Sequence, residues 1–397
     1  MRRAFKFRMR PTAGQHLRLS ACVDSHREIY NAALQERRDA WRMCRKTVFY
    51  GAQSDQLKHI RRDRPDLAVW SFSSQQATLR RLNKAFAGFF RRVRAGEQPG
   101  YPRFKGGDRF DTVEWPKDGD GCRWKSEVAR VYLQGVGNVK VTVHRPVQGR
   151  VKTIQVQRCG RNWYLILSCA DVPTRPLPPT GAAVGVDVGI VDFAVTSDAR
   201  HIGNPRWGRQ AARRLEAAQR ALSAKQRGSK NRRSAKETLA SRYRKIANQR
   251  RDFHYKAARE MIAGHDVVVV EDLEIKHMLR RAKPRPDPEH PGQFLPNGAA
   301  AKSGLNRAIH DAGWAAFVTI LKAKAEEAGR RVVDNVDPRH TSDRCEACGH
   351  TAKENRVTQP LFVCGRCGHA AQADEHAARN ILRAGLALLA AEHPEAV

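Results

Sequence analysis

The sequence predicts an α+β protein built from several domains. Three features lead to this expectation: the chain has 397 residues, 41% of them are hydrophobic, and segments with helical and with strand periodicity follow one another along it. A chain of this length exceeds what one hydrophobic core usually holds, so roughly two to four domains are expected. The hydrophobic content is sufficient for them to fold, which excludes disorder as the dominant state.

The first region is expected to join a strand to a helical segment. Phe5, Phe7 and Met9 alternate with basic residues, a pattern typical of a strand. From Pro11 to about residue 95, apolar residues recur at three- and four-residue spacing with lysines and arginines between them, which predicts amphipathic helices. The run 96–107, GEQPGYPRFKGG, contains two prolines and four glycines, so no regular element is expected to cross it.

The second region, residues 110–175, is expected to be β-structure. Val139, Val141 and Val143 are separated by polar residues, and further short β-rich runs follow between turns. This pattern predicts a small antiparallel barrel or a sandwich. The segment 173–179 contains four prolines and is interpreted as a linker, so that a new domain begins near residue 183.

The third region is expected to mix strands with helices. A strand around GVDVG is followed by a helix-compatible stretch, 201–260, with 18 Lys or Arg against 4 Asp or Glu. Such a charge run is either a solvated helical face or a binding surface. Residues 280–304 are rich in Pro, Gly, Ala and charge, and are expected to form a mobile loop. The remaining expected elements are a strand 267–270, a helix 314–328, a strand 331–336 and a helix from 374 to about 391.

The charge balance indicates a polyanionic partner. The 73 Lys plus Arg residues outnumber the 40 Asp plus Glu residues, which gives a net charge of +33. This surplus favours nucleic acid as the partner and argues against small-molecule metabolism. The first residues, MRRAFKFRMR, contain no apolar signal core, and no apolar run approaches the roughly 18 residues that span a bilayer. We therefore expect a cytoplasmic protein without membrane contact.

Four of the nine cysteines form the pattern of a zinc site. Cys345 and Cys348 are separated from Cys364 and Cys367 by fifteen residues, and each pair is followed by Gly-His. Two C-x-x-C units at this spacing predict a zinc ribbon that holds one structural Zn²⁺ through four thiolates, and the glycines permit the tight turn at each pair. The two histidines are alternative ligands, although four thiolates already complete the site.

Three carboxylates stand on separate expected elements. Asp187 interrupts an apolar strand, where an unpaired ionised carboxylate is costly to bury and needs a metal or a cationic partner. The strand VVVVED ends in Glu271 and Asp272, which alternation places on opposite faces, so one of the two is selected without being identified. Asp374 precedes an amphipathic stretch, where an ordinary helix N-cap is the alternative interpretation.

Together the three carboxylates predict a divalent-metal nuclease. Oxygen ligands suit Mg²⁺, with Mn²⁺ as an alternative, and two ions about 3.5 to 4 Å apart can activate water and stabilise the leaving oxygen of a phosphodiester. The sequence contains no P-loop GKS or GKT, no G-x-S-x-G and no H-E-x-x-H, so the corresponding enzyme classes gain no support.

The order of the motifs resembles a known family more specifically than any one of them. The segments are GVDVGIVDFAV, the basic helical stretch, VVVVEDLEIKHM, DAGWAAF, TSDRCEACGH, FVCGRCGH and QADEHAARNIL, together with FRMRPTAGQ, AFAGFFRR and GYPRFKGG nearer the amino terminus. They resemble the TnpB (OrfB) family of transposon-associated, RNA-guided DNA endonucleases, which are relatives of the compact type V CRISPR effectors. The resemblance covers nearly the full chain.

The resemblance implies a RuvC-like nuclease of RNase H fold with an inserted zinc ribbon, and an amino-terminal wedge-like β-barrel interrupted by a helical recognition lobe. The expected domains are a wedge-like barrel (1–10 and 100–182), a helical recognition lobe (11–99), a RuvC-like nuclease domain (183–340 and 371–397) and a zinc ribbon that binds target nucleic acid (341–370).

The resemblance also assigns roles to residues. The first Asp of the family's G-x-D-x-G falls on Asp187, the Glu of its E-D-L motif on Glu271, and its final Asp on Asp374. All three are implied to be catalytic and to bind magnesium. The family commonly has Asn two positions after the final Asp, where this chain has His376, so the role of His376 stays open, as does that of Asn380.

Three further positions match parts of the family that approach nucleic acid. Gln76 matches the part of the helical lobe near the short DNA motif beside the target, and Arg103 and Lys105 match the P-R-F-K stretch. The resemblance thus implies a guide RNA and a double-stranded target DNA as partners, with base pairing reading the sequence. The size favours one protein per guide, with a dimer as the alternative.

Three other functions are alternatives to a guided nuclease. A guided DNA-binding repressor without nuclease activity is disfavoured because all three carboxylates are present. A transposase that itself moves DNA lacks support from a paired tyrosine or a second acidic cluster. A compact type V CRISPR effector is the nearest alternative among enzymes, and only its genomic surroundings would distinguish it.

Overall fold

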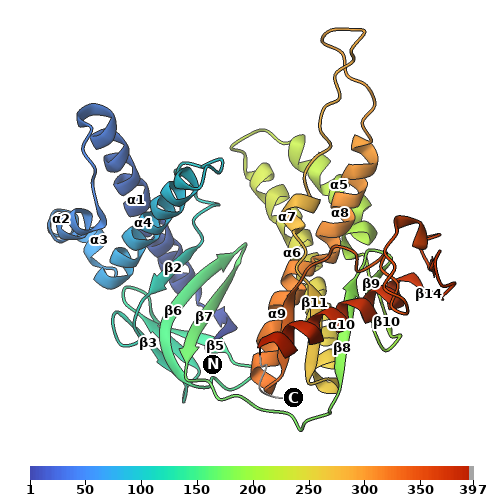
Figure 1. Ribbon diagram of the computed structural model, residues 1–397. Helices are drawn as coiled ribbons and strands as arrows, with labels where there is room; N and C mark the ends of the chain where they lie inside the picture. Colours follow the sequence, from blue (N-terminus) through green and yellow to red (C-terminus); the bar gives the residue numbers. More distant parts are fainter. Residues whose placement is uncertain (393–397) are drawn as a thin grey trace. The chain divides into compact units, whose positions relative to one another are not determined.

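The chain divides into two units, Met1–Pro173 and Thr174–Val397, each with its own hydrophobic core (Figure 1). The computed structural model describes residues 1–392, so residues 393–397, the end of the expected nuclease segment 371–397, lie outside the described part. No helix within 1–392 is long and apolar enough to cross a membrane.

The first unit contains a seven-stranded sheet in which every pair of neighbours is antiparallel. The strand order is β2-β6-β7-β1-β5-β4-β3, so the first strand of the chain lies at the centre. The strands are β1 (Arg3–Arg10), β2 (Thr112–Trp115), β3 (Cys122–Lys125), β4 (Arg130–Leu133), β5 (Gly137–Thr142), β6 (Arg150–Cys159) and β7 (Asn162–Ala170). The alternation predicted for β1 is confirmed, because Phe5, Phe7 and Met9 are all buried in the core.

Four helices are inserted between β1 and β2 of this sheet: α1 (Ala13–Cys44), α2 (Tyr50–Asp63), α3 (Pro65–Ala68) and α4 (Phe72–Arg94). A capping box starts α1, in which the Thr12 hydroxyl accepts from the Gln15 backbone N–H and the Gln15 side chain accepts from the Thr12 N–H. The buried His26 ring in α1 lies 2.8 Å from the Ser74 hydroxyl and so joins α1 to α4. As predicted, no helix or strand crosses 96–107.

The second unit is built on a mixed five-stranded sheet, ordered β10-β9-β8-β11-β12. The strands β8, β9 and β10 are antiparallel, whereas β8, β11 and β12 run parallel. Their bounds are β8 (Ala183–Val188), β9 (Asp192–Thr196), β10 (His201–Gly203), β11 (Val267–Glu271) and β12 (Arg331–Val336).

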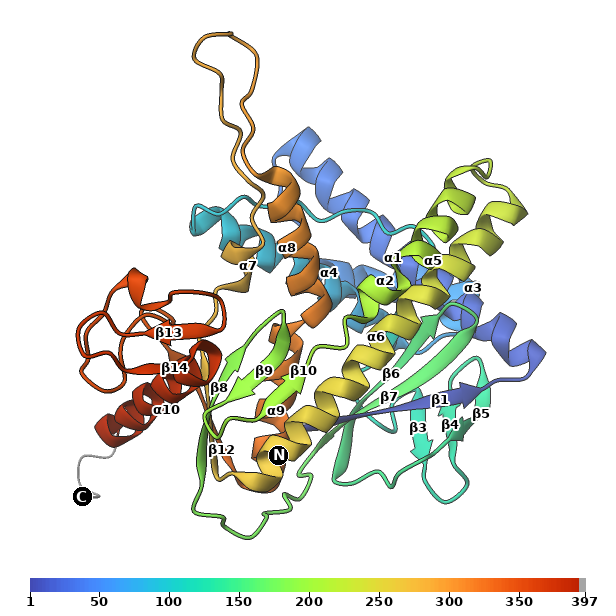
Figure 2. The ribbon, with the colours of Figure 1, turned by 90° about the vertical axis from the view of Figure 1, so that its right-hand side faces the viewer.

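Helices cover both faces of this sheet (Figure 2). On one face, α6 (Lys230–Gly264) and α9 (Trp314–Ala328) form the larger core with β8 and β11, while α10 (Ala373–Glu392) packs on the opposite face. The other helices are α5 (Trp207–Ser223), α7 (Ile275–Met278), α8 (Ala299–Ala312) and the short η1 (Lys353–Asn355), and the ribbon hairpin is β13 (Leu361–Val363) with β14 (Ala370–Gln372).

The structure corrects two expectations in this unit. The segment 280–304 was expected to be a loop throughout, but α8 begins at Ala299, because three alanines followed by Lys302 are good helix formers and Ile309 is buried at the far end. Residues 201–203 were expected to be helical and instead form β10, which pairs with β9. Sheet pairing, which is not local in the sequence, overrode the helical pattern there.

Candidate functional site

Two neighbouring parallel strands bring Asp187 and Glu271 together. Val270 of β11 pairs with Val186 of β8, so the next residue of each strand, Glu271 and Asp187, stands level at the carboxyl ends. Both side chains lie on the face that α10 covers: Val184, Val186 and Val268 belong to the core on the other face, and Val269 packs with Ile381 of α10.

Two glycines let α10 lie directly against these strands. A Cβ on Gly185 of β8 would stand 2.1 Å from the Ala378 carbonyl oxygen, and a Cβ on Gly385 of α10 would stand 2.2 Å from a methyl carbon of Val269. No side chain larger than hydrogen fits either contact. This close approach places the first turn of α10, with Asp374, beside the carboxyl ends of β8 and β11.

The charges of Glu271 and Asp374 both act on Asp187. Burial first, and then the charges of Glu271 and Asp374, raise the pKa of Asp187 to about 7, while Arg356 acts in the opposite direction. Burial also raises the pKa of Glu271, opposed by a hydrogen bond from Thr341. Neighbouring anions in a partly buried site disfavour ionisation of one another, which a divalent cation would reverse.

The structure also distinguishes the candidates that the sequence left open. Asp272 is exposed and does not contribute to the raised pKa of Asp187, whereas Glu271 does. Asp374 lies inside the first turn of α10, and the Gln372 side chain, rather than Asp374, accepts the backbone N–H of Glu375 at 2.6 Å. The Asp374 carboxylate instead accepts from the Arg356 guanidinium at 2.8 Å.

Two residues that sequence reasoning missed contact the carboxylates. Arg356 lies at the end of η1, and it pairs with Asp374 while donating to the Gln359 carbonyl at 2.9 Å. Thr341 is buried, and its hydroxyl donates to Glu271 at 2.5 Å. Both belong to the segment between β12 and α10. The motif TSDRC contains Thr341, but nothing in its pattern indicates that the hydroxyl would reach β11.

The carboxylates fit a divalent cation by donor type and charge. They offer hard oxygen ligands, and the negative charges of Glu271 and Asp374 at Asp187 are opposed by the positive charge of Arg356. Within the described residues, two groups have ligand atoms that all lie within 4.8 Å of one another: the four cysteines, and Glu346 with His369 and His376. The carboxylate trio is not among them, so ion binding would have to draw these oxygens closer together.

The four cysteines form two turns of matching geometry. In each turn, the backbone carbonyl of the first cysteine accepts a hydrogen bond from the glycine that follows the second cysteine. The Gly349 N–H donates to Cys345 and the Gly368 N–H to Cys364, both at 3.0 Å. Both glycines have positive φ, +73° and +72°. The Sγ atoms of Cys345 and Cys367 are 3.7 Å apart. Two sulfur atoms bound to one tetrahedral zinc ion at about 2.3 Å would be about 3.8 Å apart. The four thiols could hold a zinc ion, as the spacing predicts.

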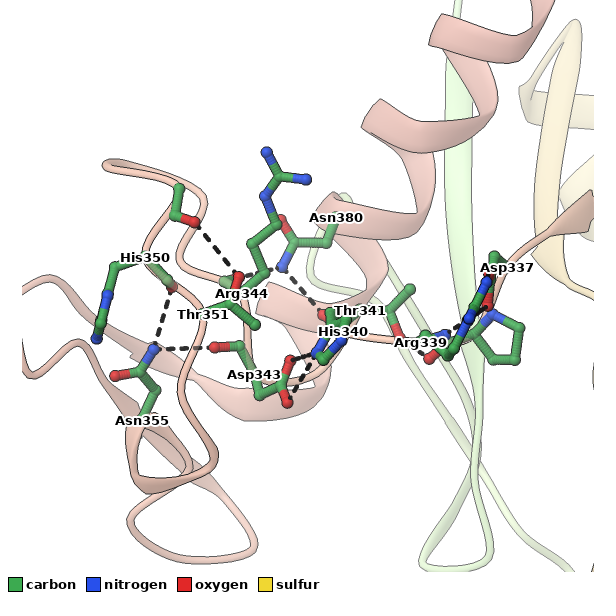
Figure 3. Close-up of polar contacts among 12 residues, drawn as sticks. Asp337, Arg339, His340, Thr341, Asp343, Arg344, His350, Thr351, Asn355 and Asn380 are labelled. Carbon is green, nitrogen blue, oxygen red and sulfur yellow. Dashed lines mark hydrogen bonds and ion pairs between the residues drawn. The ribbon is translucent and has the colours of Figure 1, made fainter.

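His376 and Asn380 contact the ribbon segment, 341–370, rather than the carboxylates. The Asn380 side chain donates to the carbonyls of Thr341 at 3.0 Å and Arg344 at 2.7 Å (Figure 3). The His376 ring accepts from the backbone N–H of Glu346 at 3.2 Å and stacks on Phe362 with 3.7 Å between ring centroids. Both residues therefore fix the start of α10.

The expected nucleic-acid contacts lie in the first unit. Gln76 is partly buried, and its amide nitrogen donates to the Ser54 hydroxyl at 2.9 Å. Arg103 is exposed, and the backbone of Lys105 is held at both its N–H and its C=O by the side chain of Asn31. A role for these three residues in binding nucleic acid stays a prediction.

Comparison with known proteins adds family relationships. Three family models match: OrfB_IS605, a probable transposase, over residues 166–282; a Cas12f1-like TNB domain over 314–381; and a helix-turn-helix domain over 1–46. The last match covers the strand β1 and the helix α1, and α1 is continuous from Ala13 to Cys44.

Two curated relatives match nearly end to end. The putative RNA-guided DNA endonuclease InsQ of Escherichia coli is 33% identical over 98% of this chain and 93% of its own length. A putative RNA-guided DNA endonuclease of Streptomyces pristinaespiralis is 31% identical over 98% of this chain and 90% of its own. The solved Cas12f1–sgRNA–target DNA complex matches with a TM-score of 0.53 at 16% identity, covering 93% of this chain and 82% of that one, which indicates a shared fold.

Proposed function

This chain belongs to the TnpB (OrfB) family, and from that premise we propose that it is an RNA-guided DNA endonuclease. The observation that carries the proposal is that Asp187 and Glu271 stand level on neighbouring parallel strands, on the face covered by α10, whose first turn carries Asp374. The two relatives of full-length similarity are named as endonucleases of this kind.

Each unit fits a part of this activity. We assign the second unit to a RuvC-like nuclease domain of RNase H fold with the zinc ribbon inserted before the last carboxylate; the mixed five-stranded sheet with helices on both faces supports this. The antiparallel sheet of the first unit is assigned to the wedge-like barrel, and α1–α4 to the recognition lobe. The helices interrupt the sheet between β1 and β2, as this assignment requires.

The nuclease chemistry is assigned to the carboxylates. When bound, two Mg²⁺ ions would supply an activated water and Lewis-acid stabilisation of the phosphodiester. Asp187, Glu271 and Asp374 would hold them through oxygen ligands. Because the pKa of Asp187 is raised to about 7, this carboxyl is partly protonated at neutral pH and would lose its proton on binding. No side chain in this arrangement has to become a covalent nucleophile.

Arg356 and Thr341 have defined tasks in this scheme. Thr341 orients Glu271 through a hydroxyl hydrogen bond, which favours the ionised carboxylate. Arg356 pairs with Asp374 and reduces the mutual repulsion of the carboxylates. Its guanidinium carries five donors, so it is suited to bind a phosphate oxygen of the scissile group as well.

The partners follow from charge and family. A net charge of +33 suits a protein that holds an RNA–DNA heteroduplex by its phosphates while base pairing selects the target. We assign the recognition of a short motif beside the target to the first unit, including Gln76, Arg103 and Lys105. One protein per guide is our working stoichiometry, and the zinc ribbon is assigned one structural Zn²⁺ and contact with target nucleic acid.

The test is purification from cells that carry the native locus, sequencing of the bound RNA, and cleavage assays with matching DNA. Asp187→Ala and Glu271→Ala should each abolish cutting and leave guided DNA binding nearly intact. Asp272→Ala is the matched control, because Asp272 is adjacent to Glu271 but exposed, and it should cut at the wild-type rate. A soluble preparation free of RNA would count against guidance, and binding without any cutting by the wild type would indicate a repressor.

A further inference from the structure

The start of α10 is held by the first turn of the zinc ribbon. Glu346 lies between the ligands Cys345 and Cys348, and three side chains converge on it. Its carboxylate accepts from Arg379 of α10 at 2.9 and 3.0 Å and lies 3.0 Å from the His369 ring. Its backbone N–H donates to His376 of α10 at 3.2 Å.

This cluster is better explained as a structural contact between the ribbon and α10 than as a second metal site. Glu346, His369 and His376 lie close enough to share an ion. However, the guanidinium of Arg379 already contacts both carboxylate oxygens, and a second cation there would compete with it. The Nε2 atom of His376 is also in use, since it accepts a backbone N–H.

The choice of histidine at position 376 is not explained by packing alone. The ring is fully buried and stacks on Phe362, so a purely apolar side chain of similar size would fit the same space. Because Nε2 accepts, the ring hydrogen resides on Nδ1, and this atom is buried without a hydrogen-bond partner in the described part of the chain. An unpaired buried donor is unfavourable. The favourable contribution of the ring is therefore its Nε2 acceptor, which binds the Glu346 N–H in the first turn of the ribbon.

The position of Asp374 depends on this contact between the ribbon and α10. Asp374 precedes His376 by two residues in the first turn of α10, and the first turn of a helix frays unless outside contacts fix it. The outside contacts here come from the ribbon: Glu346 for His376 and Arg379, and Arg356 for Asp374 itself.

We propose that His376 is a positioning residue that couples zinc binding in the ribbon to divalent-metal binding by the carboxylates, an inference that rests on the proposed nuclease function. Zinc fixes the turn that contains Glu346, His376 transfers that position to the first turn of α10, and Asp374 is thereby held beside Asp187. Since coupling between two sites is reciprocal, divalent-metal binding at the carboxylates must in turn tighten the binding of zinc.

The experiment measures this reciprocity in the full chain. Zinc affinity is measured by equilibrium competition with a zinc-selective fluorescent chelator, with and without saturating Mg²⁺, and Mn²⁺ affinity is measured by electron paramagnetic resonance without nucleic acid. We expect Mg²⁺ to tighten zinc binding at least about threefold in the wild type, which corresponds to about 0.7 kcal/mol of coupling. In His376→Leu the zinc affinities with and without Mg²⁺ should be equal, and Mn²⁺ should bind several-fold more weakly. His376→Gln should restore both, because its amide oxygen reaches the position of Nε2 and can accept the Glu346 N–H.

Two further variants separate positioning from stability. His254→Leu removes a buried histidine of the same unit, whose ring lies 2.9 Å from the Ala312 carbonyl, and should retain the coupling whatever its stability. Arg379→Met, which releases Glu346 without altering the ring, should weaken the coupling even if His376→Leu does not fold.

The outcomes are distinguishable. Equal zinc affinities with and without Mg²⁺ in the wild type, or wild-type coupling in His376→Leu, would overturn the positioning role and leave the nuclease intact. A wild type that neither binds Mn²⁺ nor cuts DNA would overturn the proposed function itself.

Discussion

Replacing Asp187 with Asn should stabilise the protein in the absence of Mg²⁺ and abolish DNA cutting. Burial and the two neighbouring carboxylates raise the pKa of Asp187 from 3.8 to about 7 in the folded protein. Between these values the folded state binds more protons than the unfolded chain, so the free energy of unfolding falls as the pH rises. Asn carries no charge at any pH, and the variant escapes this loss.

The magnitude follows from the pKa difference. A rise from 3.8 to about 7 is about 3 units, which at 1.36 kcal/mol per unit gives a ceiling of about 4 kcal/mol above pH 7. At about pH 5 the same linkage gives less than about 2 kcal/mol, because the folded carboxyl is still protonated. Solvent and side-chain relaxation reduce such values, so we expect about half of the ceiling at neutral pH.

The assay uses zinc-loaded protein without added Mg²⁺ or chelator. Hydrogen exchange of β8 and β11 reports the opening of the second unit specifically, which a global melting curve of a two-unit chain would not. Asp198→Asn, at an exposed turn of the same unit, is the control and should change stability by less than about 0.5 kcal/mol. A gain that does not grow between about pH 5 and pH 8, or a destabilised variant, would refute the electrostatic crowding of the carboxylates.

Three other predictions concern neighbouring residues. Arg356→Ala should reduce single-turnover cleavage at least about tenfold with guided binding unchanged, because the cation opposing the carboxylate charge is lost; partial recovery is expected for Arg356→Lys, and full activity of the Ala variant would contradict the role. Thr341→Val should raise the pKa of Glu271 further and move the rising limb of the cleavage–pH profile to higher pH; an unshifted profile would exclude that hydrogen bond from function. Gly185→Ala should cost about 2 kcal/mol or more and displace α10, as read by denaturation and Mn²⁺ affinity, whereas Gly264→Ala, with no atom within 4 Å of the added carbon, should be neutral.

The parts of the fold that depend on local pattern could be predicted from the sequence. Strand β1 alternates cleanly, and α9 and β12 have the bounds that the periodicity gives. The spacing of the four cysteines is a strong signal because the tetrahedral geometry of zinc dictates it. Asp187 could also be found, since a carboxylate within an apolar strand needs a partner.

The rest depends on contacts between distant segments. Glu271 and Asp272 are equivalent in sequence until the register with β8 places one of them level with Asp187. Arg356 is one of many arginines in a basic chain, and only the fold of the ribbon directs it to Asp374. Likewise, Gln76 lies in a helix where its amide contacts Ser54, a use that no local pattern indicates.

The carboxylate site depends on two independent constraints on a single helix. Gly185 and Gly385 determine how close α10 lies to the sheet, because any side chain there would push it outward. They do not determine where along its axis the helix begins, which depends on contacts that Asn380, His376 and Arg379 make with the segment 341–346. Substitutions at the two glycines should therefore lower stability and metal affinity together. Substitutions at His376, Arg379 or Asn380 should change metal affinity with a smaller effect on stability.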